Sequence, residues 1–200
     1  MAVEHVKFME LHSDETIWYF FKKGEANGFS LLFKKYYPQL HVYGLKLSNN
    51  QEITEDCLQN FFIQLFEDRE KENSIKNLKA YLFVSFKRRL IKQLQKNQKN
   101  LPISEAQLFK TNFTFSAEEI SIHQEIQFLC TSTLANLINN LSPRQKEVLY
   151  LKYYSGMNSS DIAEVMDMNY QSVLNVLQKA LSKLRKASEN QQIKNILKKS

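Results

Sequence analysis

The sequence contains little glycine or proline, with four Gly and three Pro among its 200 residues. Both residue types mark tight turns and interrupt helices, so their scarcity disfavours a chain of many β-hairpins and favours helices. No stretch approaches the roughly 18 apolar residues of a membrane span. The N-terminal residues up to Glu15 lack the apolar core of a signal peptide. We therefore expect a cytoplasmic protein that makes no membrane contact of its own.

Side chains that commonly carry chemistry are also sparse. The two cysteines, Cys57 and Cys130, stand far apart among apolar helical residues, which indicates buried thiols in a reducing compartment. The four histidines show no ligand spacing, so we predict no metal site. Neither a glycine-rich phosphate loop nor a nucleophile motif is present, and we expect no catalytic residues, no enzyme activity and no cofactor. The acidic pair Glu55–Asp56 better suits a helix N-terminus or a protein surface.

What the chain does have is apolar residues and positive charge. Hydrophobic residues make up 43% of it, which is enough for a packed core, and the net charge of +6 suits a polyanionic partner. We predict an all-α fold of two small helical domains joined by a flexible linker, the C-terminal one a helix-turn-helix. The expected parts are an N-terminal domain (1–96), a linker (97–116), a C-terminal domain (117–187) and a tail (188–200).

Four helical patterns follow one another in the N-terminal domain. Ser13 is expected to cap the first, which Gly24 ends. In the second, Pro38 should kink or split the helix. Thr54 is expected to cap the third, whose apolar stripe predicts a buried face. That stripe consists of Leu58, Phe61, Phe62, Leu65 and Phe66.

The fourth pattern, from about Asn77 to Lys96, has a one-sided positive charge, and no acidic residue lies between Glu72 and Glu105. Such a run is either a solvated face or a DNA contact, and the one-sidedness favours DNA. The basic side chains are Lys87, Arg88, Arg89, Lys92, Lys96 and Lys99. The polar segment that follows, with Pro102 and scattered apolar residues up to Phe115, predicts the linker.

The C-terminal domain begins with two helix-start signals. Ser116 with Glu119 forms a capping box that predicts a long helix to about Asn140. Ser142, Pro143 and Gln145 then predict a helix that ends near Gly156. Asn158 caps a short helix, and the turn at 167–169 leads into a last helix over 170–187.

A short capped helix, a tight turn and a long helix with a polar start are typical of a DNA-binding helix-turn-helix. The outward side chains of the last helix can read base edges in a major groove; they are Tyr170, Gln171, Ser172, Asn175 and Lys179. Arg144 and Lys146, near an earlier helix start, can contact flanking phosphates. The plainer alternative is a helical bundle with a solvated polar face.

Residues 141–185, which open with LSPRQKEV, resemble the C-terminal domain of bacterial sigma factors, which reads the −35 promoter element. Response-regulator DNA-binding domains share that pattern, but the N-terminal half decides between them. ITEDCLQNFFIQLF resembles the sigma helix that docks on RNA polymerase. LKAYLFVSFKRRLIKQLQK resembles the stretch that melts and reads the −10 element, and FSLLFKKYYPQL the opening helix. The resemblance covers about 30–96 and 117–187 and indicates the extracytoplasmic-function type.

The resemblance implies core RNA polymerase, promoter DNA and an anti-sigma factor as partners. It implies a polymerase-binding face formed by Asp56, Gln59, Asn60 and Ile63. It implies a −10 DNA-binding set of Lys87, Arg88, Lys92, Gln95 and Lys96. It also implies that the loop 68–77 holds a flipped base and that the linker threads the active-site cleft of the polymerase.

The sequence departs from the family at several positions. The family usually has Asn at position 88, Asp at 92 and Arg at 95, where this chain has Arg88, Lys92 and Gln95; Leu174 and Val176 stand where basic residues are frequent. The cations strengthen phosphate binding and weaken any base contact carried over to that face. The alternative function is a stand-alone dimeric helix-turn-helix regulator, although we find neither a dimerisation surface nor an effector pocket in the sequence.

Overall fold

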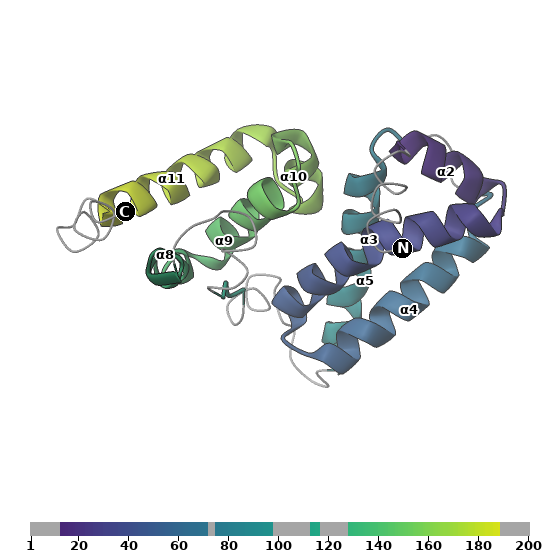
Figure 1. Cartoon of the computed structure of the whole chain (residues 1–200), viewed down its shortest axis with the longest axis horizontal. Helices are drawn as coiled ribbons and strands as arrows, with labels where there is room; N and C mark the ends of the chain where they lie inside the picture. Colours follow the sequence, from purple (N-terminus) through teal and green to yellow (C-terminus); the bar gives the residue numbers. More distant parts are fainter. Residues whose placement is uncertain (1–12, 72–74, 98–112, 117–127, 189–200) are drawn as a thin grey trace. The chain divides into compact units, whose positions relative to one another are not determined.

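The computed structural model describes residues 13–71, 75–97, 113–116 and 128–188. The chain divides into two compact units, residues 1–108 and 109–200 (Figure 1). All regular structure within the described ranges is helical, which confirms the predicted all-α fold. Across these ranges no helix is long and apolar enough to cross a membrane. The predicted limits of the linker stay a prediction, because most of that segment lies outside the described residues.

The first unit is built around one long helix, α3 (Ala26–Ser48). The helices α2 (Asp14–Lys22), α4 (Gln51–Glu67) and α5 (Leu78–Asn97) all contact it, and Figure 1 shows α3 and α4 side by side. Apolar faces meet between the helices, where Leu32, Leu40, Leu58, Leu82 and Phe86 are fully buried. This core leaves the outer faces of α4 and α5 to the solvent.

The helix starts of this unit follow the capping rules, with one correction. Ser13 accepts a hydrogen bond from the Thr16 amide at 3.2 Å, as predicted. Thr54 does not cap α4: Asn50 does, and its side chain accepts from the Ile53 amide at 2.9 Å. Thr54 lies one turn inside the helix, fully buried, and its hydroxyl donates to the Asn50 carbonyl at 2.8 Å. Both residues are good N-caps, and burial decided between them.

Pro38 lies inside α3, which continues through it to Ser48. Of the two expected outcomes, a split of this helix is therefore wrong, and a kink stays a prediction. Proline removes one hydrogen bond and crowds the preceding turn, which ordinarily interrupts a helix. Here Pro38 is on the exposed side, while Tyr36 and Leu40 on either side are fully buried. Packing of the neighbouring residues therefore keeps the chain helical on both sides of Pro38.

The second unit contains α8 (Phe128–Asn139), α9 (Pro143–Leu149), α10 (Ser159–Val165) and α11 (Tyr170–Ser188). The capping box at Ser142 is confirmed: its hydroxyl accepts from the Gln145 amide at 3.4 Å, and Gln145 Oε1 accepts from the Ser142 amide at 3.1 Å. The box predicted at Ser116 and Glu119 extends outside the described residues.

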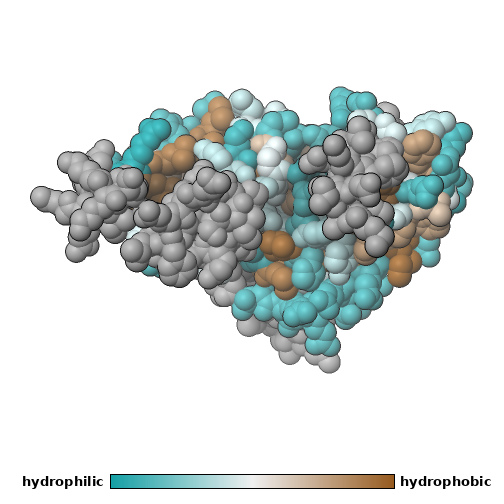
Figure 2. Space-filling model, in the orientation of Figure 1, coloured by the Kyte–Doolittle hydropathy of each residue, from teal (hydrophilic) through white to brown (hydrophobic). Residues whose placement is uncertain are grey.

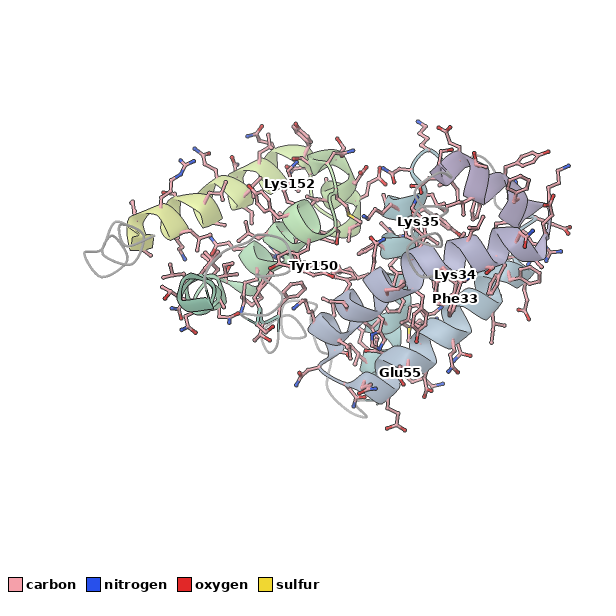
Figure 3. The ribbon with its side chains drawn as sticks, viewed as in Figure 1. Phe33, Lys34, Lys35, Glu55, Tyr150 and Lys152 are labelled. Atoms are coloured by element: carbon pink, nitrogen blue, oxygen red, sulfur yellow. The ribbon has the colours of Figure 1, made fainter. Side chains whose placement is uncertain are left out.

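An aromatic cluster forms around a π-helix, η1 (Tyr150–Tyr154), which continues α9 and which the sequence did not predict. Tyr150, which is labelled in Figure 3, stacks on Tyr154 at 5.6 Å between ring centroids. The buried rings of Phe113 and Phe115 also pack against Tyr150. The Asn139 side chain accepts from the Phe115 amide and donates to its carbonyl, each at 2.9 Å. The C-terminal end of the predicted linker is thus part of the second unit's core.

We expect Gly44→Ala to destabilise the first unit. A Cβ at Gly44 would lie 2.7 Å from Thr54 Cγ2 and 2.9 Å from Phe86 Cζ, so α3, α4 and α5 would have to separate. Alanine normally stabilises a helix relative to glycine, but overpacking costs about 1–3 kcal/mol. Chemical denaturation measures the change, and the exposed Asn27→Ala in the same helix serves as control. An unchanged or raised free energy of unfolding would show that the helices do not approach this closely.

Candidate nucleic-acid interface

The outer face of α4 carries the four side chains predicted to bind a protein partner: Asp56, Gln59, Asn60 and Ile63. All four are exposed, and Ile63 keeps 58% of its surface in solvent. The Asn60 side chain donates to the Asp56 carbonyl at 2.9 Å, which orients the amide along the helix. Ile63 thus offers apolar surface with polar side chains beside it, which a contact surface with an apolar centre and a polar rim would use. We call these four residues the α4 outer face.

A row of aromatic side chains on α3 lies beside α4: Phe29, Phe33, Tyr37 and His41. Consecutive rings are stacked, and the closest pair, Phe33 and Tyr37, has 4.7 Å between centroids. The row is only half-buried against α4, and Figure 2 shows hydrophobic residues over α3 and α4 amid a hydrophilic surface. The spacing of four residues is visible in the sequence, but it does not specify how far these rings are exposed.

Phe66 was expected in the core and instead lies at its edge, 36% exposed. Its ring packs edge-on against Phe21 and Phe29, and the Arg69 guanidinium covers it at 4.4 Å from the centroid. Arg69 also donates to the Phe66 carbonyl at 2.8 Å. A solvent-facing aromatic under a cation extends the aromatic row to the end of α4.

The basic face of α5 is smaller than predicted. Arg88, Lys92, Gln95 and Lys96 are exposed and share one side of the helix. Lys87 is only 5% exposed, so we leave it out of the DNA-binding face. One helical step of about 100° turns it away from Arg88 and into the buried row of Phe83 and Ile91. We call the four exposed residues the α5 basic face.

Arg89 ties α5 to α4. Its guanidinium donates to the Asn60 carbonyl at 3.0 Å. The same side chain stands near Cys57, whose pKa burial raises to about 11 despite the opposing effect of the arginine charge. Cys57 is therefore a neutral, buried thiol, as its apolar sequence context predicted.

A small cavity of about 130 Å³ opens beside Arg89, between the end of α4 and the first half of α5. Gln64, Asp68, Tyr81, Ser85 and Arg89 line it, together with apolar atoms of Phe61 and Leu65. Asp68 accepts from Lys71 at 2.6 Å and from Gln64 at 2.8 Å, and these hydrogen bonds lower the pKa of its carboxyl group. We call this space the α4–α5 cavity. It combines an aromatic ring with hydrogen-bond donors and acceptors.

In the second unit, α10 and α11 form the predicted helix-turn-helix. Asn158 caps α10 by accepting from the Asp161 amide at 2.9 Å, and Asn169 accepts from the Ser172 amide at 2.7 Å at the start of α11. Asp167 turns the chain between them with φ of 49°. Val173 and Ala180, both fully buried, fix the inward side of α11.

The predicted reading side chains are on the opposite side of α11. Tyr170, Gln171, Asn175 and Lys179 are exposed, and Ser172 is half-buried. Gln171 donates to the Asn175 side chain at 3.2 Å, so the two amides form one polar group on successive turns. An amide pair of this kind can present donors and acceptors to base edges.

The two predicted phosphate contacts differ. Arg144 is exposed near the start of α9, where the helix N-terminus also favours an anion. Lys146 is half-buried, its ammonium group donates to the Asn139 carbonyl at 3.4 Å, and burial lowers its pKa. Arg144 is therefore the better placed of the two to meet a phosphate.

Comparison with known proteins identifies both units. The model of sigma-70 region 2 matches residues 32–100, and that of sigma-70 region 4 matches residues 132–184, together more than half of the chain. No curated protein matches the sequence.

Two solved structures are similar in fold. One is CnrH in complex with the cytosolic domain of CnrY, with a TM-score of 0.58 at 13% identity over 89% of this chain and 98% of that one. The other is the sigma factor RpoE in complex with the anti-sigma factor NepR from Bartonella quintana. Its TM-score is 0.54 at 21% identity, over 82% of this chain and 98% of that one.

We expect Lys92→Ala and Lys87→Ala to change different properties, although the two lysines lie five residues apart on the same helix. Lys92→Ala should reduce the salt dependence of single-stranded DNA binding by about 0.7 in log–log slope, because one phosphate contact is lost, and leave stability unchanged. Lys87→Ala should lower the free energy of unfolding by about 1–3 kcal/mol through lost packing and leave the slope unchanged. Binding titrations at several salt concentrations and denaturation curves measure the two quantities. The reverse outcome would mean that Lys87 faces the nucleic acid.

Proposed function

The chain belongs to the sigma-70 family of transcription initiation factors, and we propose how its surfaces divide the work of initiation. The first unit docks on core RNA polymerase through the α4 outer face and reads the −10 element along α5. The second unit reads the −35 element through α11. One observation supports this division. The chain combines an exposed helix face centred on the uncharged Ile63 with a basic helix and a helix-turn-helix. Sigma factors are regulators rather than enzymes, and we assign no catalytic residue.

Docking on polymerase rests on the chemistry of the α4 outer face. Ile63 is a large apolar side chain held in water, and burial of such a residue against a partner removes apolar surface at a favourable free energy. Gln59 and Asn60 beside it can exchange hydrogen bonds across the interface. The helix itself is anchored from behind by Phe61, Phe62 and Leu65, so the face is pre-organised before binding.

Recognition of the −10 element rests on the α5 basic face and the α4–α5 cavity. Arg88, Lys92 and Lys96 supply positive charge for the phosphates of a melted strand. The cavity lies where the same helix begins and offers the Tyr81 ring with the polar groups of Gln64 and Ser85. One unpaired base entering it would exchange stacking in the duplex for contacts with these groups.

Recognition of the −35 element rests on Gln171 and Asn175. Each amide can form a bidentate pair with an adenine edge, and α11 presents both from one side. Few cations stand at the start of the helix, since Lys179 lies more than two turns inside it. The isolated chain should therefore bind free promoter duplex weakly. In the complex with polymerase, two tethered DNA contacts and the polymerase itself supply the remaining affinity.

The type and regulation of the factor are part of the proposal. A chain in which region 2 is followed by region 4 suits the extracytoplasmic-function type. The two solved structures described above are each a complex with a second protein, and one of those second proteins is named an anti-sigma factor. We propose that an anti-sigma protein also binds this chain. We further propose that this chain acts in the cytoplasm, where polymerase and its promoters are found.

The polymerase assignment is tested by the double variant Gln59→Ala with Asn60→Ala. Both side chains are exposed, and the Asn60 carbonyl that holds Arg89 is retained, so thermal stability should change little. Affinity for core polymerase should fall at least about tenfold if the pair forms hydrogen bonds there. Glu52→Ala with Glu67→Ala, exposed elsewhere on α4, serves as control. Equal binding of the double variant and the parent chain would remove the α4 outer face from the interface.

The −35 assignment is tested by Gln171→Ala. Loss of one base-edge pair should cost about 1–3 kcal/mol at one promoter position and relax the preference there. Selection of −35 sequences by the holoenzyme measures it. Lys183 is exposed further along α11. Lys183→Ala should weaken binding to all −35 sequences equally, or leave binding unchanged. An unaltered preferred sequence with Gln171→Ala would show that α11 meets the DNA in another register, and tight polymerase-independent binding by a dimer would favour a stand-alone regulator.

A further inference from the structure

The start of α11, the helix that follows α10 in Figure 1, contains no charged side chain over residues 170–178. Lys179 is its first cation, and the helix contains no acidic residue as far as its end at Ser188. Lysine and arginine are the usual readers of guanine in a major groove, and acidic side chains accept from cytosine. The start of α11 therefore offers no charged reader for a G·C pair.

Two rows of uncharged side chains run along this part of the helix. Gln171 and Asn175 form one, which we call the amide row, and Tyr170 and Leu174 form the other, which we call the apolar row. Leu174 lies three positions after Gln171, so the two rows are neighbours on the helix surface. Tyr170 is 52% exposed and Leu174 is half-buried, so both keep apolar surface in contact with solvent.

The amide row has a defined hydrogen-bonding pattern. Gln171 Nε2 donates to Asn175 Oδ1 at 3.2 Å. This bond uses the nitrogen of one amide and the oxygen of the other, so Gln171 Oε1 can accept from a base and Asn175 Nδ2 can donate to one. Adenine presents the complementary groups in the major groove, an N6 donor beside an N7 acceptor. The amide row therefore suits the adenine of an A·T pair.

The thymine of an A·T pair adds a methyl group to the same groove edge, and apolar side chains recognise that group. We propose that Leu174 is a specificity-determining residue that contacts a thymine methyl group beside the adenine read by the amide row. The −35 element of this chain then consists of A·T pairs where it faces the start of α11. The proposal rests on the proposed function, because it takes α11 as the helix that reads this element.

Uracil in place of thymine tests the methyl contact directly, because the two bases differ only by the C5-methyl group. The holoenzyme, formed from the full chain and core polymerase, first selects its preferred −35 sequence from random duplexes. The position whose preference Gln171→Ala relaxes marks where α11 lies. Each thymine at or next to that position is then replaced by uracil, and competition measures the affinity of the holoenzyme. One such replacement should weaken binding at least about threefold, because burial of one methyl group contributes that much.

Variants of Leu174 assign the contact to this side chain. Leu174→Ala should bind the thymine and uracil duplexes equally. Leu181 is also half-buried and lies about two turns further along the same side of α11, so Leu181→Ala is the matched control and should keep the difference. The ratio of the two affinities within one variant does not depend on how much of that variant is folded. Leu174→Arg should change the selected base at this position toward guanine, because a guanidinium pairs with guanine O6 and N7.

Three results would overturn the assignment of Leu174: selection of G·C pairs where α11 lies, equal affinity of the parent chain for thymine and uracil at every tested position, or an unchanged selected sequence with Leu174→Arg. In each of them Gln171→Ala would still relax the selected sequence, so α11 would remain the reading helix. Failure of the proposed function has a separate signature: the holoenzyme would select no −35 sequence, or Gln171→Ala would leave the selected sequence unaltered. That result would overturn both proposals.

Discussion

Close packing of three helices around α3 is the constraint on which the rest of the first unit depends. At Gly44 the backbone of α3 approaches Thr54 on α4 and Phe86 on α5 so closely that no side chain fits between them. This contact sets the rotation of α4 and α5 about their own axes. Once Leu58 and Phe86 point inward, the periodicity of the helix decides which side chains point outward. The α4 outer face and the α5 basic face are consequences of that rotation.

The same rotation explains how one short unit can bind a protein and a nucleic acid. Ile63 with its amide neighbours and the cations of α5 are on different helices, and the Arg89 side chain joins the two by its hydrogen bond to the Asn60 carbonyl. In the proposed division of work, polymerase docking on α4 and strand binding along α5 would therefore act on two helices that this hydrogen bond joins. A shift of one helix would disturb both surfaces at once.

In the second unit, aromatic rings and side-chain amides hold the helices in place. Phe113 and Phe115 precede the helices in sequence, yet they pack on Tyr150 of the π-helix and are held by Asn139. This packing fixes the end of α8 against η1, while Asn158 and Asn169 fix the starts of α10 and α11. The helix-turn-helix thus rests on a small core that includes residues from what the composition marks as linker.

Local features of this protein could be predicted from the sequence because they depend on neighbouring residues. The caps at Ser13, Ser142 and Asn158 and the amphipathic periods of the helices are of this kind, and they sufficed for the fold class and for the exposed residues of α4 and α11. The tertiary structure alone decided matters that depend on contacts distant in sequence. It buried Lys87 in the row of Phe83 and Ile91, made Thr54 a core residue and kept α3 whole through Pro38. It also brought residues of the segments 14–23 and 75–78, which are more than fifty residues apart, to the wall of one cavity. Periodicity specifies which residues share a face, but only packing against the other helices specifies which face is buried.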